Sequence, residues 1–433
     1  MSFTAHPLEI APSELKAQLR RAANAYDAFC LLETGSAFQD PLDDYQFLAA
    51  GGARQWHRVP QATSSGWSQF KTQWRERPTW LFGVLAYDLK NAMEPGLMSH
   101  PKGMPFQDDL CLFEPEWVVE VTRLGEVILH CHGDSKAWLA ALRQHAHTRR
   151  AHSDTPTWAQ DWTHADYVQR AEQIAFHLNR GDIYEANLCF RHFCESDADP
   201  VEIYAALMAR TQAPMAGLFR CEGQWLICGS PERYLHIGDH EGLRWVHSQP
   251  IKGTAPRDVD PRQDALNAGM LRSSEKEQAE NVMIVDLVRN DLSHVAAPSS
   301  VTVPRYLEVR TLPTVHHLIS TVQAQLNHEK DWLDAVTTSF PMGSMTGAPK
   351  VSAMKIIQSQ ESARRGWYSG SLGFIRPDGT GDWNVIIRSL LHDSDSGIWE
   401  VWAGSAITLQ AEATDEWDEC SLKLEAMHQA LSS

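Results

Sequence analysis

GSLGFIRPDGTGDWNVIIRSLLH, residues 370–392, contains two apolar, strand-like runs joined by Pro-Asp-Gly at 377–379. Proline followed by Asp-Gly is a turn signal, and the flanking runs are rich in β-branched and aromatic residues, so the stretch predicts a β-hairpin. EWVVEVTRLGEVILHCH (116–132) predicts a second hairpin, with its turn at 124–126, and LICGSPERYLHIG (226–238) is expected to be a strand that turns through Ser-Pro. Strands joined by short turns pair in an antiparallel manner.

Helical patterns lie between these strands. ADYVQRAEQIAFHLNRGD (165–182) has helical periodicity and ends at Gly181, a residue typical of the position after a helix. Another helix is expected to begin after Ser274, and the chain is expected to end in a helix over 414–431. The sequence therefore predicts an α+β fold, a large two-layer body of mostly antiparallel β-sheets flanked by helices, in preference to a Rossmann-type fold.

The chain has 433 residues, more than a single hydrophobic core usually supports. HAHTRRAHSDTPTWAQDW (145–162) is polar and poor in helix signals, so we expect a boundary near residue 155. It would separate a β-rich N-terminal region (1–155), which contains LLETG (31–35), from a second region (156–433) that contains the other motifs described below.

Composition excludes several classes of partner. The formal charge is −17, from 38 basic and 55 acidic residues, and such a surface repels phosphate backbones and anionic lipid, so neither nucleic acid nor a membrane is expected as a partner. The sequence has no run of about 18 apolar residues and no signal-peptide pattern, so a cytoplasmic location is expected. Its eight cysteines form no CxxC pair, which favours buried free thiols over disulfides or a zinc site.

One lysine stands in an unusual context. In PIKGT (250–254), Lys252 lies where an apolar strand gives way to a Gly-Thr turn. A solvent-facing lysine is one interpretation, and a lysine placed for chemistry is the other. The five residues alone do not decide between them.

Two helices present pairs of glutamates. Glu277 and Glu280 share a face that continues to Ile284 and Leu287, both expected in the core, and Ser274 with Glu277 fits a capping box. In the C-terminal helix, Glu416, Glu419 and Lys423 share a face. Each set fits an ordinary solvated, charged helix face. Facing each other, the two pairs would instead suit Mg²⁺, which takes one or two protein carboxylates and completes its shell with water and substrate oxygens.

Two further basic residues, Arg388 and Lys350, lie in segments that could bind an anion. Strand alternation in DWNVIIRSLL places Arg388 on the same side as Ile386 and Leu390, so it is expected to meet either a buried carboxylate or an anionic ligand. Lys350 follows Ala-Pro in PMGSMTGAPK (341–350), whereas a phosphate-binding loop requires Gly-Lys, so this segment is expected to be a structural turn.

Taken together, these motifs resemble the chorismate-utilising enzymes. This family includes anthranilate synthase large subunits, aminodeoxychorismate synthase component I, and isochorismate and salicylate synthases. The resemblance is carried in order by SPERYL (230–235), PIKGT (250–254), EKEQAENVMIVDLVRNDL (275–292), FPMGSMTGAPK (340–350), YSGSLGFI (368–375) and ATDEWDECSLK (413–423). It implies an anthranilate synthase component I-like fold for the chain and a chorismate-binding catalytic domain over 156–433.

The resemblance also implies roles for single residues. Glu280 and Glu419 would bind Mg²⁺ directly, and Glu277 and Glu416 through water, so that the ion holds the ring carboxylate of chorismate. Glu232 would be the general acid that assists departure of the C4 hydroxyl. The remaining substrate-binding residues implied are Thr254, Gly253, His317, Tyr368, Arg388, Gly404 and Lys423.

PIKGT separates the branches of the family. Anthranilate synthases resemble PI-Ala-GT here, whereas aminodeoxychorismate synthases carry the lysine, so Lys252 is implied to attack C2 of chorismate before ammonia attacks C4. Burial and a nearby cation would favour the neutral amine that this step needs. The resulting hypothesis is synthesis of 4-amino-4-deoxychorismate for 4-aminobenzoate and folate. Anthranilate synthesis is the alternative, and a non-catalytic tryptophan- or chorismate-binding regulator is a third hypothesis.

The chain departs from the family pattern at two places. Isochorismate and salicylate synthases have a lysine in the strand GDIYEANLCF (181–190), where most amidating members have glutamine; this chain has Glu185, and its role stays open. Residues 404–406 read Gly-Ser-Ala, where many members have a second glycine. No glutaminase element is visible, so free ammonia or a separate glutamine amidotransferase subunit is implied. LLETG (31–35) resembles an element of tryptophan pockets, and it equally fits a structural tryptophan site or a strand end.

Overall fold

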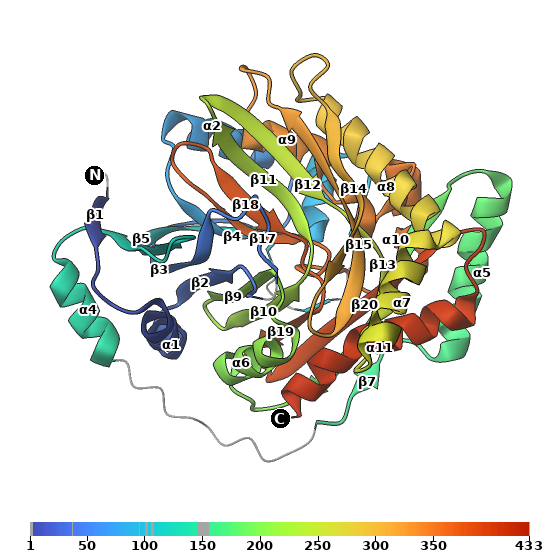
Figure 1. Ribbon diagram of the computed structural model, residues 1–433, viewed down its shortest axis with the longest axis horizontal. Coiled ribbons are helices and arrows are strands. Elements are labelled where there is room, and N and C mark those ends of the chain that lie inside the picture. The colour runs from blue at the N-terminus through green and yellow to red at the C-terminus, as the bar shows by residue number, and fades with distance from the viewer. Residues whose placement is uncertain are drawn as a thin grey trace.

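The computed structural model describes residues 3–36, 38–94, 96–99, 103–104, 108–144 and 156–432 (Figure 1). Every strand pairing in these ranges is antiparallel, and the strands join into a continuous system that folds into two layers. This confirms the expected α+β class and the two-layer body of antiparallel sheet.

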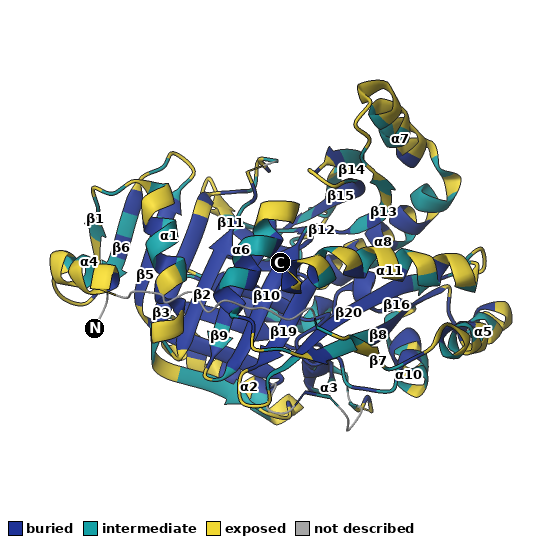
Figure 2. Cartoon of the chain, turned by 90° about the horizontal axis from the view of Figure 1, so that it is seen from below, coloured by how far each residue is buried: buried dark blue, intermediate teal, exposed yellow. Residues whose placement is uncertain are grey.

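The first layer runs across the molecule in Figure 2 beneath a row of helices. Its strands, in spatial order, are β7 (Ala159–Gln160), β8 (Glu185–Glu195), β20 (Ile398–Ile407), β19 (Ser389–Asp393), β10 (Gln224–Ser230), β9 (Met215–Cys221), β2 (Ala28–Glu33), β3 (Tyr45–Val59), β5 (Leu110–Thr122), β6 (Val127–Cys131) and β1 (Thr4–Pro7). The short β16 (Gly347–Ala348) also pairs with β8. The layer therefore contains strands from both ends of the chain.

The second layer begins where β5 also pairs with β4. From there the strands follow in the order β4 (Leu81–Leu85), β17 (Ser371–Ile375), β18 (Gly381–Asn384), β11 (Arg233–His240), β12 (Leu243–Gln249) and β15 (Val315–Gln325), with β13 (Ile251–Pro256) and β14 (Thr302–Thr311) both paired to β15. β13 carries the PIKGT motif, so the layer positions Lys252.

Alternation along the strands separates two cores. In β2, Cys30 and Leu32 face the second layer, whereas Phe29 and Leu31 face the helices on the other side. The helices of that outer face are α1 (Pro12–Ala22), α4 (Ser135–Gln144), α5 (His164–Arg180), α6 (Pro200–Thr211), α10 (Lys350–Gln360) and α11 (Ala413–Leu431). Figure 2 shows α1, α6 and α11 lying across this face. Each apolar strand face is thus buried against a partner layer.

The remaining helices are associated with the second layer and its loops. They are α2 (Ser64–Glu76), α3 (Lys90–Met93), α7 (Pro261–Ser273), α8 (Glu275–Ser293) and α9 (Trp332–Ser339), with the short 3₁₀ turns η2 (Tyr87–Leu89) and η3 (Gly343–Met345). A third 3₁₀ turn, η1 (Ala23–Ala25), continues from α1 on the outer face of the first layer. α8 packs against β13 and β15, and α7 projects from the body in Figure 2. α8 thereby brings the first glutamate pair to the strand that carries Lys252.

Local predictions are largely confirmed. The hairpins β5–β6 and β17–β18 form at the predicted turns. Segment 226–238 turns at Ser-Pro as expected, and there the chain passes from β10 in the first layer to β11 in the second, each of which pairs with other strands. α5 ends at Gly181 in the left-handed conformation (φ 78°), and α8 begins after Ser274, whose side chain accepts a hydrogen bond from the Glu277 amide. Ile284 is buried as expected, but Leu287 is only half-buried, against Gly343.

The strand assignment around Arg388 was wrong. β18 ends at Asn384 and β19 begins at Ser389, so Arg388 lies in the connection between two strands with φ 53°. Strand alternation therefore does not apply to it, and the left-handed backbone sets the direction of its side chain. The reason is that the chain leaves one layer at 385–388 and enters the other, a change that an unbroken apolar run conceals.

The expectations for the cysteines, the domain boundary and LLETG have different outcomes. All eight cysteines are buried and free. The expected boundary near 155 falls within 145–155, outside the described residues, while β2 and β9 pair across it within one layer. LLETG ends β2, where Glu33 bonds to Lys16 (2.6 Å) and Tyr204 (2.7 Å). In the described parts of the chain no helix is long and apolar enough to cross a membrane.

Candidate active site

Lys252 is buried between the two layers. β13 pairs with β15 in a register that opposes Thr254 to His317, and a hydrogen bond of 3.1 Å joins the Thr254 hydroxyl to Nδ1 of that histidine. Gly253 has φ 86°, and a Cβ there would lie 2.7 Å from Oε2 of Glu277 on α8. The left-handed backbone favours glycine at this position, where β13 faces the glutamate helix.

The Lys252 ammonium meets two carboxylates. Its Nζ donates to Glu185 at the start of β8, and Oε2 of Glu280 lies 3.8 Å away. Burial disfavours the charged form, but these carboxylates outweigh it and raise the pKa of Lys252 above its ordinary value. The expectation that the surroundings favour the neutral amine is therefore wrong for these side chains alone, because the sequence did not show that Glu185 forms an ion pair with the lysine.

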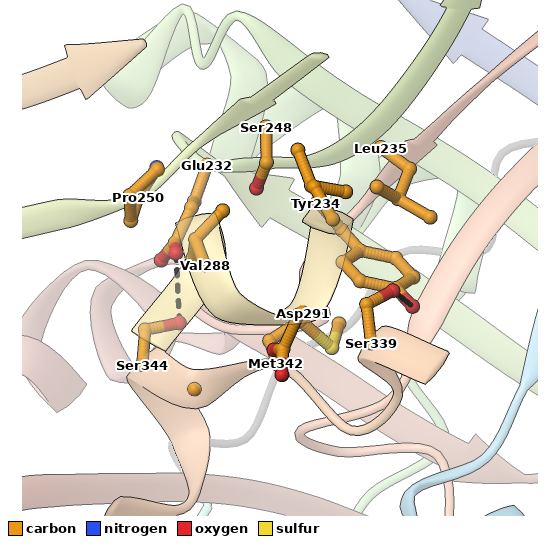
Figure 3. Close-up of a pocket in the computed structure, with 12 residues that line it drawn as sticks. Glu232, Tyr234, Leu235, Ser248, Pro250, Val288, Asp291, Ser339, Met342 and Ser344 are labelled. Atoms are coloured by element: carbon orange, nitrogen blue, oxygen red, sulfur yellow. Dashed lines mark hydrogen bonds between the residues drawn. The ribbon is translucent and has the colours of Figure 1, made fainter. Parts of the chain in front are cut away.

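Glu232 has the properties of a general acid. It is 4% exposed, and burial raises its pKa to about 7, opposed by a hydrogen bond of 2.7 Å from the Ser344 hydroxyl to Oε1. Figure 3 shows the two side chains joined by this bond in the lining of a cavity of ≈ 20 Å³, room for about one water molecule. A carboxyl group with a pKa near neutrality can be protonated in the resting enzyme and release its proton in the reaction.

The four predicted metal ligands lie on two helices at one end of the site. Burial raises the pKa of Glu280 to about 7 and raises that of Glu277, to which the nearby Glu419 and Glu416 also contribute. Glu416 accepts a hydrogen bond from Lys276 (3.0 Å), and Glu419 pairs with Lys423 (2.6 Å). The two helices thus gather negative charge whose mutual repulsion is only partly neutralised.

As placed, these carboxylates do not form a ready-made metal cage. Across the ranges that the structure describes, no three His, Cys, Asp or Glu side chains converge closely enough to hold an ion. The chemistry of the donor set nevertheless fits Mg²⁺, since the side chains are all hard oxygen donors and two of them have raised pKa values through burial and mutual repulsion. A bound cation would relieve both effects.

Two cations, Arg388 and Lys423, lie beside Glu419. Arg388 bonds to the Lys423 carbonyl at 3.5 Å and has no carboxylate within ion-pair distance among the described residues. This favours the anionic-ligand alternative for Arg388 over the buried carboxylate. Burial lowers the pKa of Arg388, and burial together with Arg388 lowers that of His317 to about 3, so His317 is neutral near pH 7.

Three other predicted binding residues line the same region. Tyr368 is buried and stacks on Trp402, with ring centroids 5.5 Å apart. The Lys423 ammonium donates to the Gly404 carbonyl at 2.9 Å. A Cβ at Gly404 would lie 2.4 Å from Sγ of Cys189, so the small residue is required for β20 to lie against β8. The structure therefore brings all of the predicted site residues into one region between β13, α8, α11 and β20.

Sequence reasoning missed two supporting contacts. Ser344, which bonds to Glu232, lies in the 340–350 segment, for which the sequence predicts a structural turn and no site residue. Lys276, which donates to Glu416, is the second; its place between Glu275 and Glu277 is a signal in the sequence that it lies near the acidic cluster. Lys350 is structural, as expected: its ammonium bonds to Asp291 (2.7 Å) and to the Ser339 carbonyl (2.8 Å).

Comparison with known proteins identifies the family. The profile of the chorismate binding enzymes matches residues 21–429. The chain belongs to this family. Among curated relatives, it is 34% identical over 355 residues to "Aminodeoxychorismate synthase component 1" of Klebsiella aerogenes, with 81% of this chain and 77% of the relative covered. It is 33% identical over 343 residues to the protein of the same name from Escherichia coli K12, with 78% and 73% covered.

Solved structures of low sequence identity support the fold. The menaquinone-specific isochorismate synthase of Escherichia coli superposes with a TM-score of 0.79 at 17% identity, covering 100% of this chain and 95% of that one. Anthranilate synthase component I of Streptococcus pneumoniae gives 0.70 at 20% identity, with 99% and 92% covered. The predicted anthranilate synthase component I-like fold is therefore confirmed.

Proposed function

We propose that this chorismate-binding enzyme is an aminodeoxychorismate synthase component 1, which aminates chorismate at C4 to give 4-amino-4-deoxychorismate for 4-aminobenzoate and folate synthesis. The observation that carries the proposal is the buried Lys252 of PIKGT, in the same site as a glutamic acid whose pKa is about 7. The names of the curated relatives support it. An anthranilate synthase has no use for a lysine at the C2 side of its substrate.

The reaction begins with a displacement that needs Lys252 as the neutral amine. Its ammonium must therefore first release a proton, and a cation bound at the adjacent Glu280 would favour that loss. The lone pair of neutral Lys252 Nζ forms a bond to C2 of chorismate, the two ring double bonds shift toward C4, and the C4–O bond breaks. Glu232 donates its proton to the departing hydroxyl, which leaves as water. Ammonia then attacks C4, the double bonds shift back, and the C2–N bond breaks to return Nζ as a neutral amine. Atoms and charge balance in both steps.

The acidic end of the site would hold Mg²⁺. Glu280 and Glu419 are proposed as direct ligands, and Glu277 and Glu416 as ligands through water. A bound ion would supply positive charge for the ring carboxylate of the substrate. Binding of the substrate carboxylates also falls to Arg388, whose planar guanidinium suits bidentate contact, and to Tyr368 and Lys423. The remaining contacts are proposed for Thr254, the backbone of Gly253 and Gly404, and neutral His317.

A separate glutamine amidotransferase subunit is the proposed source of ammonia. The designation "component 1" of the relatives supports a second component. With ammonium salts in place of that partner, the chain is expected to turn over by itself.

The test is a product assay with purified protein, chorismate, Mg²⁺ and ammonium. Wild type is expected to give 4-amino-4-deoxychorismate, identified by mass, and Lys252→Ala is expected to lose most of that product. Anthranilate from wild type would overturn the proposal in favour of the C2-aminating alternative. Unchanged turnover in Lys252→Ala would eliminate the covalent route while leaving the overall reaction in place.

A further inference from the structure

Lys276 joins the two helices that carry the proposed metal ligands. It is the second residue of α8, and its ammonium donates to Oε1 of Glu416, in the first turn of α11, at 3.0 Å. Glu416 is 3% exposed, and a carboxylate with so little water around it needs a counter-charge, which the lysine supplies. We infer that Lys276 competes with Mg²⁺ for these carboxylates and thereby sets how tightly the site holds the ion; this inference rests on the proposed function.

The charge of Lys276 acts on all four proposed ligands. Besides its bond to Glu416, the ammonium interacts electrostatically with Glu277 and Glu280 on its own helix and with Glu419 on α11. Each interaction favours the ionised carboxylate, which is also the effect of a bound metal cation. The lysine and the ion therefore stabilise the same four side chains, and their mutual repulsion makes each bind more weakly in the presence of the other.

The two cations also need the same acceptor. Glu416 is proposed to hold Mg²⁺ through a water molecule, and that water would donate a hydrogen bond to the carboxylate. One oxygen of this carboxylate already accepts from Lys276. An ammonium is purely a donor and cannot bind the metal itself, so the lysine contributes no ligand in return. Its presence in the cluster therefore lowers the affinity for the ion.

Of the three lysines that pair with site carboxylates, Lys276 is the one that can be displaced. The Lys252 side chain is 8% exposed, and Lys423 is fixed by a second bond, to the Gly404 carbonyl at 2.9 Å. The Lys276 side chain is 39% exposed, and among the described residues Glu416 is the one hydrogen-bond partner of its ammonium. A flexible four-carbon side chain at the start of a helix can turn its charge into water without movement of the backbone.

The experiment measures Mg²⁺ binding in the absence of chorismate. The full-length protein is titrated with MgCl₂ in a calorimeter at a fixed low ionic strength. Lys276→Met removes the charge and keeps an unbranched side chain, and it is expected to lower the dissociation constant for Mg²⁺ about 10-fold, the effect of removing one partly exposed positive charge beside the ion. Lys276→Arg keeps the charge and is expected to stay within about threefold of wild type.

Arg289→Met is the matched control. It removes an exposed positive charge near the other end of the same helix, where Arg289 pairs with Asp286. Both variants change the net charge of the protein equally, so they differ in the distance between the lost charge and the four glutamates. The dissociation constant of Arg289→Met for Mg²⁺ is expected to equal that of wild type, because salt screens charges so far apart.

The outcomes separate this inference from the function on which it rests. A wild type that makes no 4-amino-4-deoxychorismate from chorismate, Mg²⁺ and ammonium overturns the proposed function. If wild type makes this product and Lys276→Met binds Mg²⁺ no more tightly than wild type, only the role of Lys276 is refuted. Equal gains in Lys276→Met and Arg289→Met would also refute it, by assigning the effect to net charge. Should Lys276→Met fail to fold, Lys276→Gln takes its place under the same criterion.

Discussion

Removal of the Ser344 hydroxyl is expected to raise the pKa of Glu232 by about one unit. The serine donates to Oε1 over 2.7 Å, and both side chains are buried away from bulk solvent. A hydrogen bond to a charged group contributes about 1.5–3 kcal/mol, and one to a neutral group about 0.5–1.5 kcal/mol. The difference of about 1–1.5 kcal/mol favours the carboxylate and corresponds to roughly one pKa unit.

The sign follows from which form the serine stabilises. Ser344 stabilises ionised Glu232 and so lowers its pKa; in Ser344→Ala the carboxylate loses that donor, and the pKa rises from about 7 to roughly 8. We would titrate Glu232 directly by the infrared carbonyl band of its protonated form, assigned by its disappearance in Glu232→Gln. The limb of the pH–rate profile that Glu232 controls should move by the same amount.

The matched control is Ser339→Ala. Ser339 lines the same cavity, but its hydroxyl contacts Tyr234 at 2.7 Å and the Ala335 carbonyl, with no bond to Glu232 (Figure 3). Both variants remove one buried oxygen from one cavity, so a general change in polarity would move Glu232 equally in each. A shift in Ser344→Ala no larger than that in Ser339→Ala would refute the specific hydrogen bond as its cause.

Arg388→Ala should raise the KM for chorismate by about 10- to 150-fold in steady-state kinetics, which is equivalent to one charge-assisted contact of about 1.5–3 kcal/mol. Arg388→Lys should recover little of this loss, because an ammonium lacks the planar fork of the guanidinium. Gly253→Ala should destabilise the fold by about 1–3 kcal/mol in urea titrations, because φ is 86° there and the new Cβ lies 2.7 Å from a carboxylate oxygen. Gly269→Ala, whose new Cβ meets no atom, should leave the free energy of unfolding unchanged. Glu280→Gln should abolish Mg²⁺-dependent chorismate binding in calorimetry, while the exposed Glu275→Gln keeps it.

Local turn chemistry made the hairpins predictable, whereas the order of the strands in each layer depends on non-local pairing and could not be predicted. The Pro-Asp-Gly turn defines β17–β18 from adjacent residues alone. In contrast, Ala28 of β2 pairs with Cys221 of β9, nearly two hundred residues later, and no pattern within either strand identifies that partner. An apolar run also cannot reveal where a strand ends and crosses between layers, which is why Arg388 was misassigned.

The site was predictable where the spacing of residues on one helix sets the geometry. Glu277 and Glu280, three residues apart on α8, reach the site together, as the helical period requires. The partner of Lys252 could not be obtained in this way. Glu185 meets Lys252 because β8 and β13 lie in two layers that pack against each other. The ion pair and the raised pKa of the lysine therefore follow from the fold and not from a local pattern.

The charges that remain unpaired indicate what the site is built to bind. Lys252, Lys276 and Lys423 each pair with a carboxylate of the site. Among the described residues this leaves Glu277 and Arg388 outside ion-pair distance of an opposite charge, with Glu419 near both. Burial makes both isolated charges costly, and a ligand that restores the balance must place a cation beside the glutamate and an anion beside the arginine. A metal-bound carboxylate substrate meets both requirements at once, which is why Mg²⁺ and chorismate are expected to bind with strong mutual cooperativity.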